Sequence, residues 1–200
     1  MLEDLTFKSL GLVNYHETMD LMRSHVKGEN FSNEIWLLEH PPIFTLGTAA
    51  DKKHILNVKD IPIVQSDRGG EVTYHGPGQL VIYFLLDIKK LEFSPNKLVS
   101  TIQNFVKDLL HELSIECNFI KGAPGVYVDK KKIASIGLRI SKGKSYHGIS
   151  LNFDMDLSPF KQINPCGYEG LEVVQIKDLN KDISKLQLEK LVIDLLRKIF

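Results

Sequence analysis

Two residues combine nucleophilic and acid–base chemistry with an unusual sequence context, Cys166 and Lys132. Cys166 follows Asn164-Pro165 and precedes Gly167, a pattern that predicts an ordered loop and not a core strand. A loop thiol becomes a nucleophile when a nearby cation stabilises its thiolate. An unreactive loop cysteine is the alternative, and the local sequence does not decide between them. Cys117, between a predicted helix and strand, is expected to be a buried, inert thiol.

Lys132 lies at the start of a predicted strand over residues 131–140. Strict alternation would put it on the same face as four apolar residues, Ala134, Ile136, Leu138 and Ile140. If that face is the core, burial lowers the pKa of Lys132, and the amine can exchange protons near neutral pH. The alternative, favoured by the strand pattern alone, is a side chain that reaches water at the strand end.

A glycine-rich segment, residues 68–79, is expected to form a loop before a strongly apolar predicted strand. Its glycines allow close approach of backbone to a ligand, and exposed N–H groups there can bind an anion or a carbonyl oxygen. Its polar side chains, including Arg68, Thr73 and His75, would add directional hydrogen bonds. The segment matches neither a Walker phosphate loop nor a dinucleotide fingerprint. An elaborate turn without a ligand is the alternative.

The elements that must position these residues follow from hydrophobic periodicity. Apolar spacing predicts helices over residues 16–26, 98–113 and 188–199. Strands are predicted over residues 35–39, 43–46, 80–86, 125–128, 131–140 and 146–153. Strands in the middle with helices around them indicate an α/β or α+β fold, a mixed sheet flanked by helices. We expect residues 1–200 to form a single domain.

Composition excludes several classes of function. The chain has 25 basic and 25 acidic residues, so the basic excess of a general nucleic-acid binder is missing. The histidines and cysteines form no short cluster with zinc spacing, and no metal is expected. Residues 1–6 carry no leader pattern, and the longest apolar run, residues 80–86, is too short to span a bilayer. We therefore expect a cytoplasmic protein with no membrane contact and with both thiols free.

Several sequence blocks together carry a family resemblance. They are residues 38–42 and 45–47, then Arg68-Gly69-Gly70, Thr73, His75, Gly78-Gln79 and Tyr83, then residues 132–137, His147-Gly148 and Pro165-Cys166-Gly167. In this order they resemble the octanoyltransferase family of lipoate biosynthesis, over nearly the whole chain. The residues that follow Cys166, up to Val173, match the family pattern more loosely.

The resemblance implies a fold, a reaction and a set of site residues. The fold would be the sheet shared with biotin protein ligases and lipoate ligases. Cys166 and Lys132 would form a catalytic dyad that carries an octanoyl group from octanoyl-acyl carrier protein to the target lysine of lipoyl domains, without a cofactor. The acceptors would be lipoyl domains of 2-oxoacid dehydrogenases and the glycine cleavage H protein. The implied substrate-binding residues are Arg68, Gly69, Gly70, Glu71, Val72, Thr73, Tyr74, His75, Ser135, Ile136, Gly137, Gly148, Ile149 and Ser150.

Three other functions remain open at this stage: an ATP-dependent lipoate or biotin ligase, an amidotransferase that takes octanoyl from another protein, and a non-catalytic lipoyl-domain binding module. For the transferase, we expect an apolar acyl tunnel and backbone N–H groups near Gly137 or Gly167 that bind the oxyanion. Four lysines could steer acidic partners or could simply be a solvated surface: Lys130, Lys131, Lys142 and Lys144.

Overall fold

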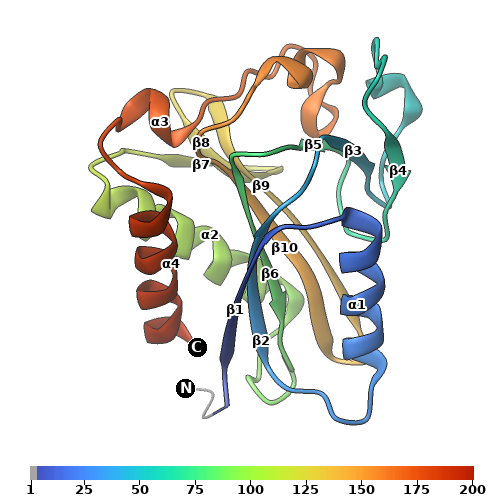
Figure 1. The fold of residues 1–200 in the computed structure, drawn as a ribbon, viewed down its shortest axis with the longest axis vertical. Coiled ribbons are helices and arrows are strands. Elements are labelled where there is room, and N and C mark those ends of the chain that lie inside the picture. The colour runs from blue at the N-terminus through green and yellow to red at the C-terminus, as the bar shows by residue number, and fades with distance from the viewer. Residues whose placement is uncertain (1–3) are drawn as a thin grey trace.

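A mixed seven-stranded sheet forms the centre of the molecule in the computed structural model, which describes residues 4–200 (Figure 1). The strand order is β1-β2-β6-β10-β9-β8-β7. The β1–β2 pair is parallel and the other neighbouring pairs are antiparallel. The bounds are β1 Thr6–Leu12, β2 Glu34–Glu39, β6 Gln79–Leu85, β7 Asn118–Ile120, β8 Ala123–Val128, β9 Lys131–Ser141 and β10 Lys144–Asn152. Residues 1–3, half of the N-terminal segment that carries no leader pattern, lie outside the described residues.

A second sheet of three short strands lies beside one end of the large sheet (Figure 1). Its order is β4-β3-β5, with β3 Ile43–Leu46, β4 Ile63–Gln65 and β5 Val72–His75. Phe44, Val72 and Tyr74 bury their side chains in a core of its own, together with Phe160. The expectation that residues 68–79 form one loop is therefore wrong for β5. Val, Thr and Tyr favour strands, and this stretch pairs antiparallel with β3.

Helices cover both faces of the large sheet (Figure 1). Helix α1 (Tyr15–Lys27) packs on one face, while α2 (Pro95–Glu112) and α4 (Lys185–Ile199) pack on the other. Each helix has an N-cap residue whose side chain accepts a hydrogen bond from a backbone N–H of the first turn. These residues are Asn14, Ser94 and Ser184. The remaining elements are α3 (Ile176–Leu179) and three short 3₁₀ turns, η1 Lys52–His54, η2 Ser158–Gln162 and η3 Pro165–Gly167.

The predicted fold class is confirmed, and so are the three predicted helices and six predicted strands, with ends shifted by a few residues. The sequence reading missed β1, β4, β5, β7 and α3, which are short or poorly alternating. Between α2, α4 and the sheet lies the largest buried cluster, which includes Leu98, Ile102 and Phe105. Each fully buried side chain of this kind contributes about 1.5–3 kcal/mol relative to exposure. Within residues 4–200, no helix is long and apolar enough to cross a membrane.

Candidate active site

Lys132 and Cys166 meet, although they are 34 positions apart in the sequence. The ammonium nitrogen Nζ of Lys132 lies 2.7 Å from the Cys166 sulfur and 3.0 Å from the carbonyl oxygen of Pro124, to which it donates. It also lies 5.1 Å from the ring centroid of Tyr127. Lys132 is only 1% exposed, so the ammonium is held by these groups and not by bulk water. The alternative in which this side chain reaches water is wrong.

A β-bulge decides which way Lys132 points. Tyr127 on β8 pairs with Lys132 and Val126 pairs with Ala134, so Ile133 has no opposite residue. Ile133 and Ala134 consequently both pack into the core under the helices. Lys132 lies on the other face, with Cys166. The expectation from strict alternation, that Lys132 shares a face with Ala134, is therefore wrong, because a bulge re-aims a side chain.

The backbone around Lys132 is fixed from two sides. Its N–H donates to the carbonyl of Glu172 at 2.9 Å, and its own carbonyl accepts from the N–H of Val174 at 3.0 Å. Gly125 leaves room for the lysine stem, since a Cβ there would lie 2.8 Å from Lys132 Cε and 2.7 Å from the carbonyl oxygen of Ala134. Its φ of +141° also favours glycine. The segment after the cysteine thus buttresses the lysine strand.

Cys166 occupies the middle of the short turn η3 (Pro165–Gly167) and is half-buried. Its φ of 56° lies in the left-handed region, an uncommon conformation for a residue other than glycine that recurs at functional sites. The turn is tied to η1 through the bond from the Asn164 N–H to the His54 carbonyl at 2.8 Å. Gly167 donates its N–H to the Asn164 carbonyl at 3.0 Å. The Gly167 amide is thus engaged within the turn, and the expectation that N–H groups near Gly137 or Gly167 bind the oxyanion stays a prediction.

The two partners alter the acid–base chemistry of the lysine. Burial works to lower the pKa of Lys132, but the adjacent Cys166 sulfur and Tyr127 hydroxyl together outweigh burial and leave that pKa above its ordinary value. The expected lowered pKa is therefore wrong for the free protein. At Cys117, by contrast, burial raises the thiol pKa, which agrees with an inert thiol packed against the helix-covered core.

A cavity of about 300 Å³ opens beside Cys166. Except for Gly69 and Tyr74, every residue in the expected substrate-binding set lines it. Tyr74 points instead into the core of the small sheet, and the Gly69 N–H donates to the carbonyl of Leu138 at 3.0 Å. The structure adds lining residues that the sequence did not single out as ligand contacts: Tyr15, Val81, Tyr83, Gly122, Pro124, His147 and Tyr168. They come from α1, β6, β8, β10 and the turns that hold Gly122 and Tyr168, which only the tertiary fold brings together.

Arg68 organises the glycine-rich segment from within. Its guanidinium donates to the carbonyl and hydroxyl oxygens of Thr45 and to the carbonyls of Gly69 and Glu71, at 2.7–3.1 Å. Burial lowers its pKa. Within residues 4–200 the guanidinium forms no ion pair with a carboxylate, so a buried positive charge lies at the wall of the cavity.

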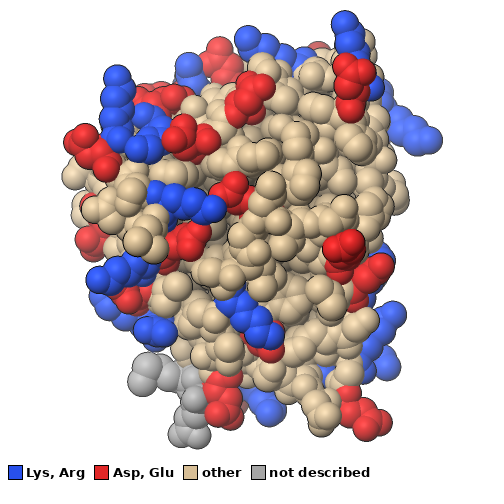
Figure 2. All heavy atoms as spheres, viewed as in Figure 1, with Lys and Arg blue, Asp and Glu red and all other residues tan. Residues whose placement is uncertain are grey.

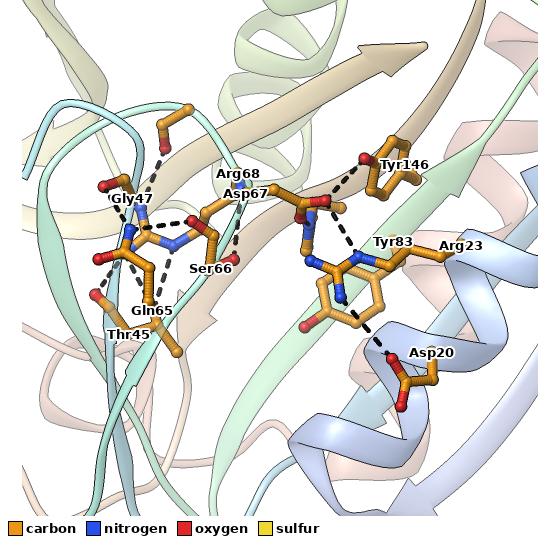
Figure 3. A network of polar contacts seen from close by, with 12 residues as sticks. Asp20, Arg23, Thr45, Gly47, Gln65, Ser66, Asp67, Arg68, Tyr83 and Tyr146 are labelled. Carbon is orange, nitrogen blue, oxygen red and sulfur yellow. Dashed lines mark hydrogen bonds and ion pairs between the residues drawn. The ribbon is translucent and has the colours of Figure 1, made fainter.

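The preceding residue, Asp67, points the opposite way, so that Asp67 and Arg68 tie the segment to both sides (Figure 3). Asp67 accepts hydrogen bonds from Arg23 Nε at 3.1 Å, the Tyr146 hydroxyl at 2.8 Å and His147 Nε2 at 2.7 Å. Burial alone would raise the pKa of Asp67, but these bonds hold it well below its usual range. Burial lowers the pKa of His147. The network orients the imidazole at the cavity wall.

The four surface lysines do not form one patch. Lys130 and Lys131 lie at one end of β9 and Lys142 and Lys144 at the other, about 35 Å apart for a strand of this length. Lys131 pairs with Glu172 at 2.9 Å, and Lys144 donates to the carbonyl of Val26 and stacks on Phe31. Figure 2 shows charges of both signs interspersed on the face it presents. Within residues 4–200, no group of three or more metal-ligating side chains could hold a metal ion.

Comparison with known proteins agrees with this geometry. Residues 14–198 match the family described as the lipoyl protein ligase A/B catalytic domain. An octanoyltransferase of Marinomonas sp. (strain MWYL1) is 50% identical over 182 residues, which are 90% of this chain and 85% of that protein. An octanoyltransferase of Dechloromonas aromatica (strain RCB) is 54% identical over 175 residues, covering 86% and 85%.

Solved structures share the fold at low sequence identity. A bipartite lipoate protein ligase from Thermoplasma acidophilum has a TM-score of 0.73 at 15% identity, covering 98% of this chain and 83% of that one. Biotin protein ligase from Aquifex aeolicus has a TM-score of 0.58 at 16% identity, covering 100% and 69%. Together, the family match, the close relatives and the shared sheet show that this chain belongs to the lipoyl protein ligase A/B catalytic domain family, and within it to the octanoyltransferases.

Proposed function

We propose that this octanoyltransferase works through an acyl-enzyme on Cys166, with Lys132 as the acid–base partner. The observation that carries the proposal is the 2.7 Å contact between the Lys132 ammonium and the Cys166 sulfur at the wall of the cavity. A thiolate suits the reaction because it is both a good nucleophile and a good leaving group. In the proposal residues 1–200 act as one catalytic domain, in the cytoplasm, where the thiol stays reduced.

The proposed cycle returns every proton. The Cys166 thiolate attacks the carbonyl carbon of the octanoyl thioester on acyl carrier protein, and the carrier sulfur leaves and takes a proton from the Lys132 ammonium. Acylation removes the Cys166 charge that helps to raise the pKa of Lys132, so that burial, opposed by Tyr127, then favours its neutral amine. The target lysine of a lipoyl domain attacks the Cys166 thioester and gives its proton to Lys132. An amide is released, and the ammonium–thiolate pair forms again.

The proposed acceptors are lipoyl domains of 2-oxoacid dehydrogenases and the glycine cleavage H protein. A structural relative from Thermoplasma acidophilum is described together with its E2 lipoyl domain, which supports a lipoyl domain as the acceptor class. In the proposal the octanoyl group enters the cavity beside Cys166, and the expected ligand residues serve as its walls and as hydrogen-bond partners of the carrier arm. Gly69 and Tyr74 support the cavity wall indirectly. Gly69 does so through its hydrogen bond to the Leu138 carbonyl, and Tyr74 does so by packing in the core of the small sheet.

Intact mass spectrometry after mixing the protein with octanoyl-acyl carrier protein, without ATP, tests the proposal. We expect one octanoyl adduct on the wild-type protein and on Cys117→Ser, and none on Cys166→Ser. An apo lipoyl domain should then remove the adduct and gain the same mass. Octanoylation that appears only with free octanoate and ATP would refute the acyl-enzyme and favour a ligase. An adduct that persists in Cys166→Ser would refute the role of that cysteine.

A further inference from the structure

A buried hydroxyl beside the cysteine turn is without a hydrogen-bond partner. The side-chain oxygen of Thr73 has no donor or acceptor within reach among residues 4–200, and the residue is only 4% exposed. Buried polar groups are nearly always paired, and an unpaired one costs stability. The neighbouring polar groups are occupied, because Thr45 accepts from Arg68 and His75 contacts Gln79 at 2.7 Å.

The strand that carries Thr73 lies against the Cys166 turn. Residues of β5 contact η3, and a Cβ on Gly167 would lie 3.3 Å from Glu71 Cγ. Along β5 the side chain of Tyr74 packs into the core of the small sheet, whereas Thr73 and His75 line the cavity that Cys166 also lines. The residue that carries the unpaired hydroxyl thus lines the cavity that holds the nucleophile.

Three nearby groups that could donate to a developing oxyanion are already engaged. The Gly167 N–H donates to Asn164, and the Arg68 guanidinium donates to backbone and hydroxyl oxygens around its own loop. Lys132 donates to the Cys166 sulfur and to Pro124. Thr73 differs from these three because its hydroxyl can donate without breaking an existing bond.

An octanoyl thioester offers one strong hydrogen-bond acceptor in its acyl part, the carbonyl oxygen. We propose that the Thr73 hydroxyl donates a hydrogen bond to this oxygen as Cys166 attacks and again as the acyl-enzyme breaks down. The inference rests on the proposed function. When the thiolate adds to the carbonyl carbon, the C=O electron pair moves onto the oxygen. Thr73 stabilises that charge without losing its proton, and the pair returns as the carrier sulfur leaves.

Thr73→Val removes the hydroxyl and keeps the branched shape, while Thr73→Ser keeps the hydroxyl and serves as the matched control. Rapid-quench intact mass spectrometry measures the rate of Cys166 acylation by two donors: octanoyl-acyl carrier protein and S-phenyl thiooctanoate, which lacks the amides of the carrier arm. We expect Thr73→Val to slow acylation by about 10²–10³-fold with both donors, as is typical for loss of one oxyanion donor. Thr73→Ser should stay within about tenfold of the wild type.

Thermal unfolding separates this role from a structural one. Because Thr73→Val removes a buried unpaired hydroxyl, its Tm should equal or exceed that of the wild type while its activity falls. If the valine variant does not fold, Thr73→Ala compared with Thr73→Ser gives the same contrast.

Two results would overturn the inference while leaving the acyl-enzyme intact. One is acylation of Thr73→Val within about threefold of the wild-type rate, far less than a lost oxyanion donor costs. The other is a loss confined to the carrier-protein donor, which would assign the hydroxyl to the carrier arm. Failure of the proposed function looks different, since the wild-type protein itself would then carry no adduct on Cys166.

Discussion

Replacing Lys132 by methionine isolates the contribution of the ammonium to the nucleophile. Methionine preserves much of the stem length and apolar volume, but it removes the charge that lies 2.7 Å from the Cys166 sulfur. At an effective dielectric constant of about 20, two unit charges at this distance attract by about 6 kcal/mol. Desolvation of the buried pair offsets part of this attraction, and removing one partner of such a pair typically costs about 3–5 kcal/mol.

That loss corresponds to a decrease of about 10²–10⁴-fold in the rate of acylation by octanoyl-acyl carrier protein, since about 1.4 kcal/mol is a factor of ten. Rapid-quench mass spectrometry at fixed pH measures the rate directly. The activity of Lys132→Met should recover in part as pH rises, because solvent then removes the thiol proton. Lys131→Met is the matched control: this neighbouring lysine forms a surface pair with Glu172, and its loss should change the rate little. A Lys132→Met rate within about fivefold of the wild type would refute the dyad.

Three further predictions concern the frame of the site. Arg68→Lys loses the planar fork that bonds to Thr45 and to two loop carbonyls, so a urea titration should show a loss of about 3 kcal/mol or more in the free energy of unfolding. Gly125→Ala places a Cβ 2.8 Å from Lys132 Cε, so acylation should slow more than in Gly122→Ala, where a Cβ meets nothing within 4 Å. Burial lowers the pKa of His40 to about 4, so the unfolded chain binds the proton first. The free energy of unfolding should therefore decrease by about 3 kcal/mol from this residue as pH drops from about 6.5 to about 4. Urea titrations at several pH values should show that His40→Gln lacks this decrease.

The order of the chemical groups along the chain is a property of the sequence. Apolar spacing located α1, α2 and α4, because amphipathic helices of three turns or more repeat their pattern several times. Short elements such as β4 and β7, at three residues each, carry too few repeats to be recognised. Val72–His75 looked like part of a loop because glycines flank it, yet pairing with β3 makes it a strand.

The residue types of the site were also set by the sequence: a cysteine between proline and glycine, a lysine at a strand end and polar residues among glycines. Whether they act together was decided by the tertiary structure. The bulge at Ile133 turns Lys132 away from the helix-covered core, and two backbone hydrogen bonds to residues 172 and 174 hold it beside the Cys166 turn. Neither effect is local, since each depends on which strand lies opposite. Periodicity therefore assigned Lys132 to the wrong face, and only the pairing of β8 with β9 brings its ammonium to the sulfur.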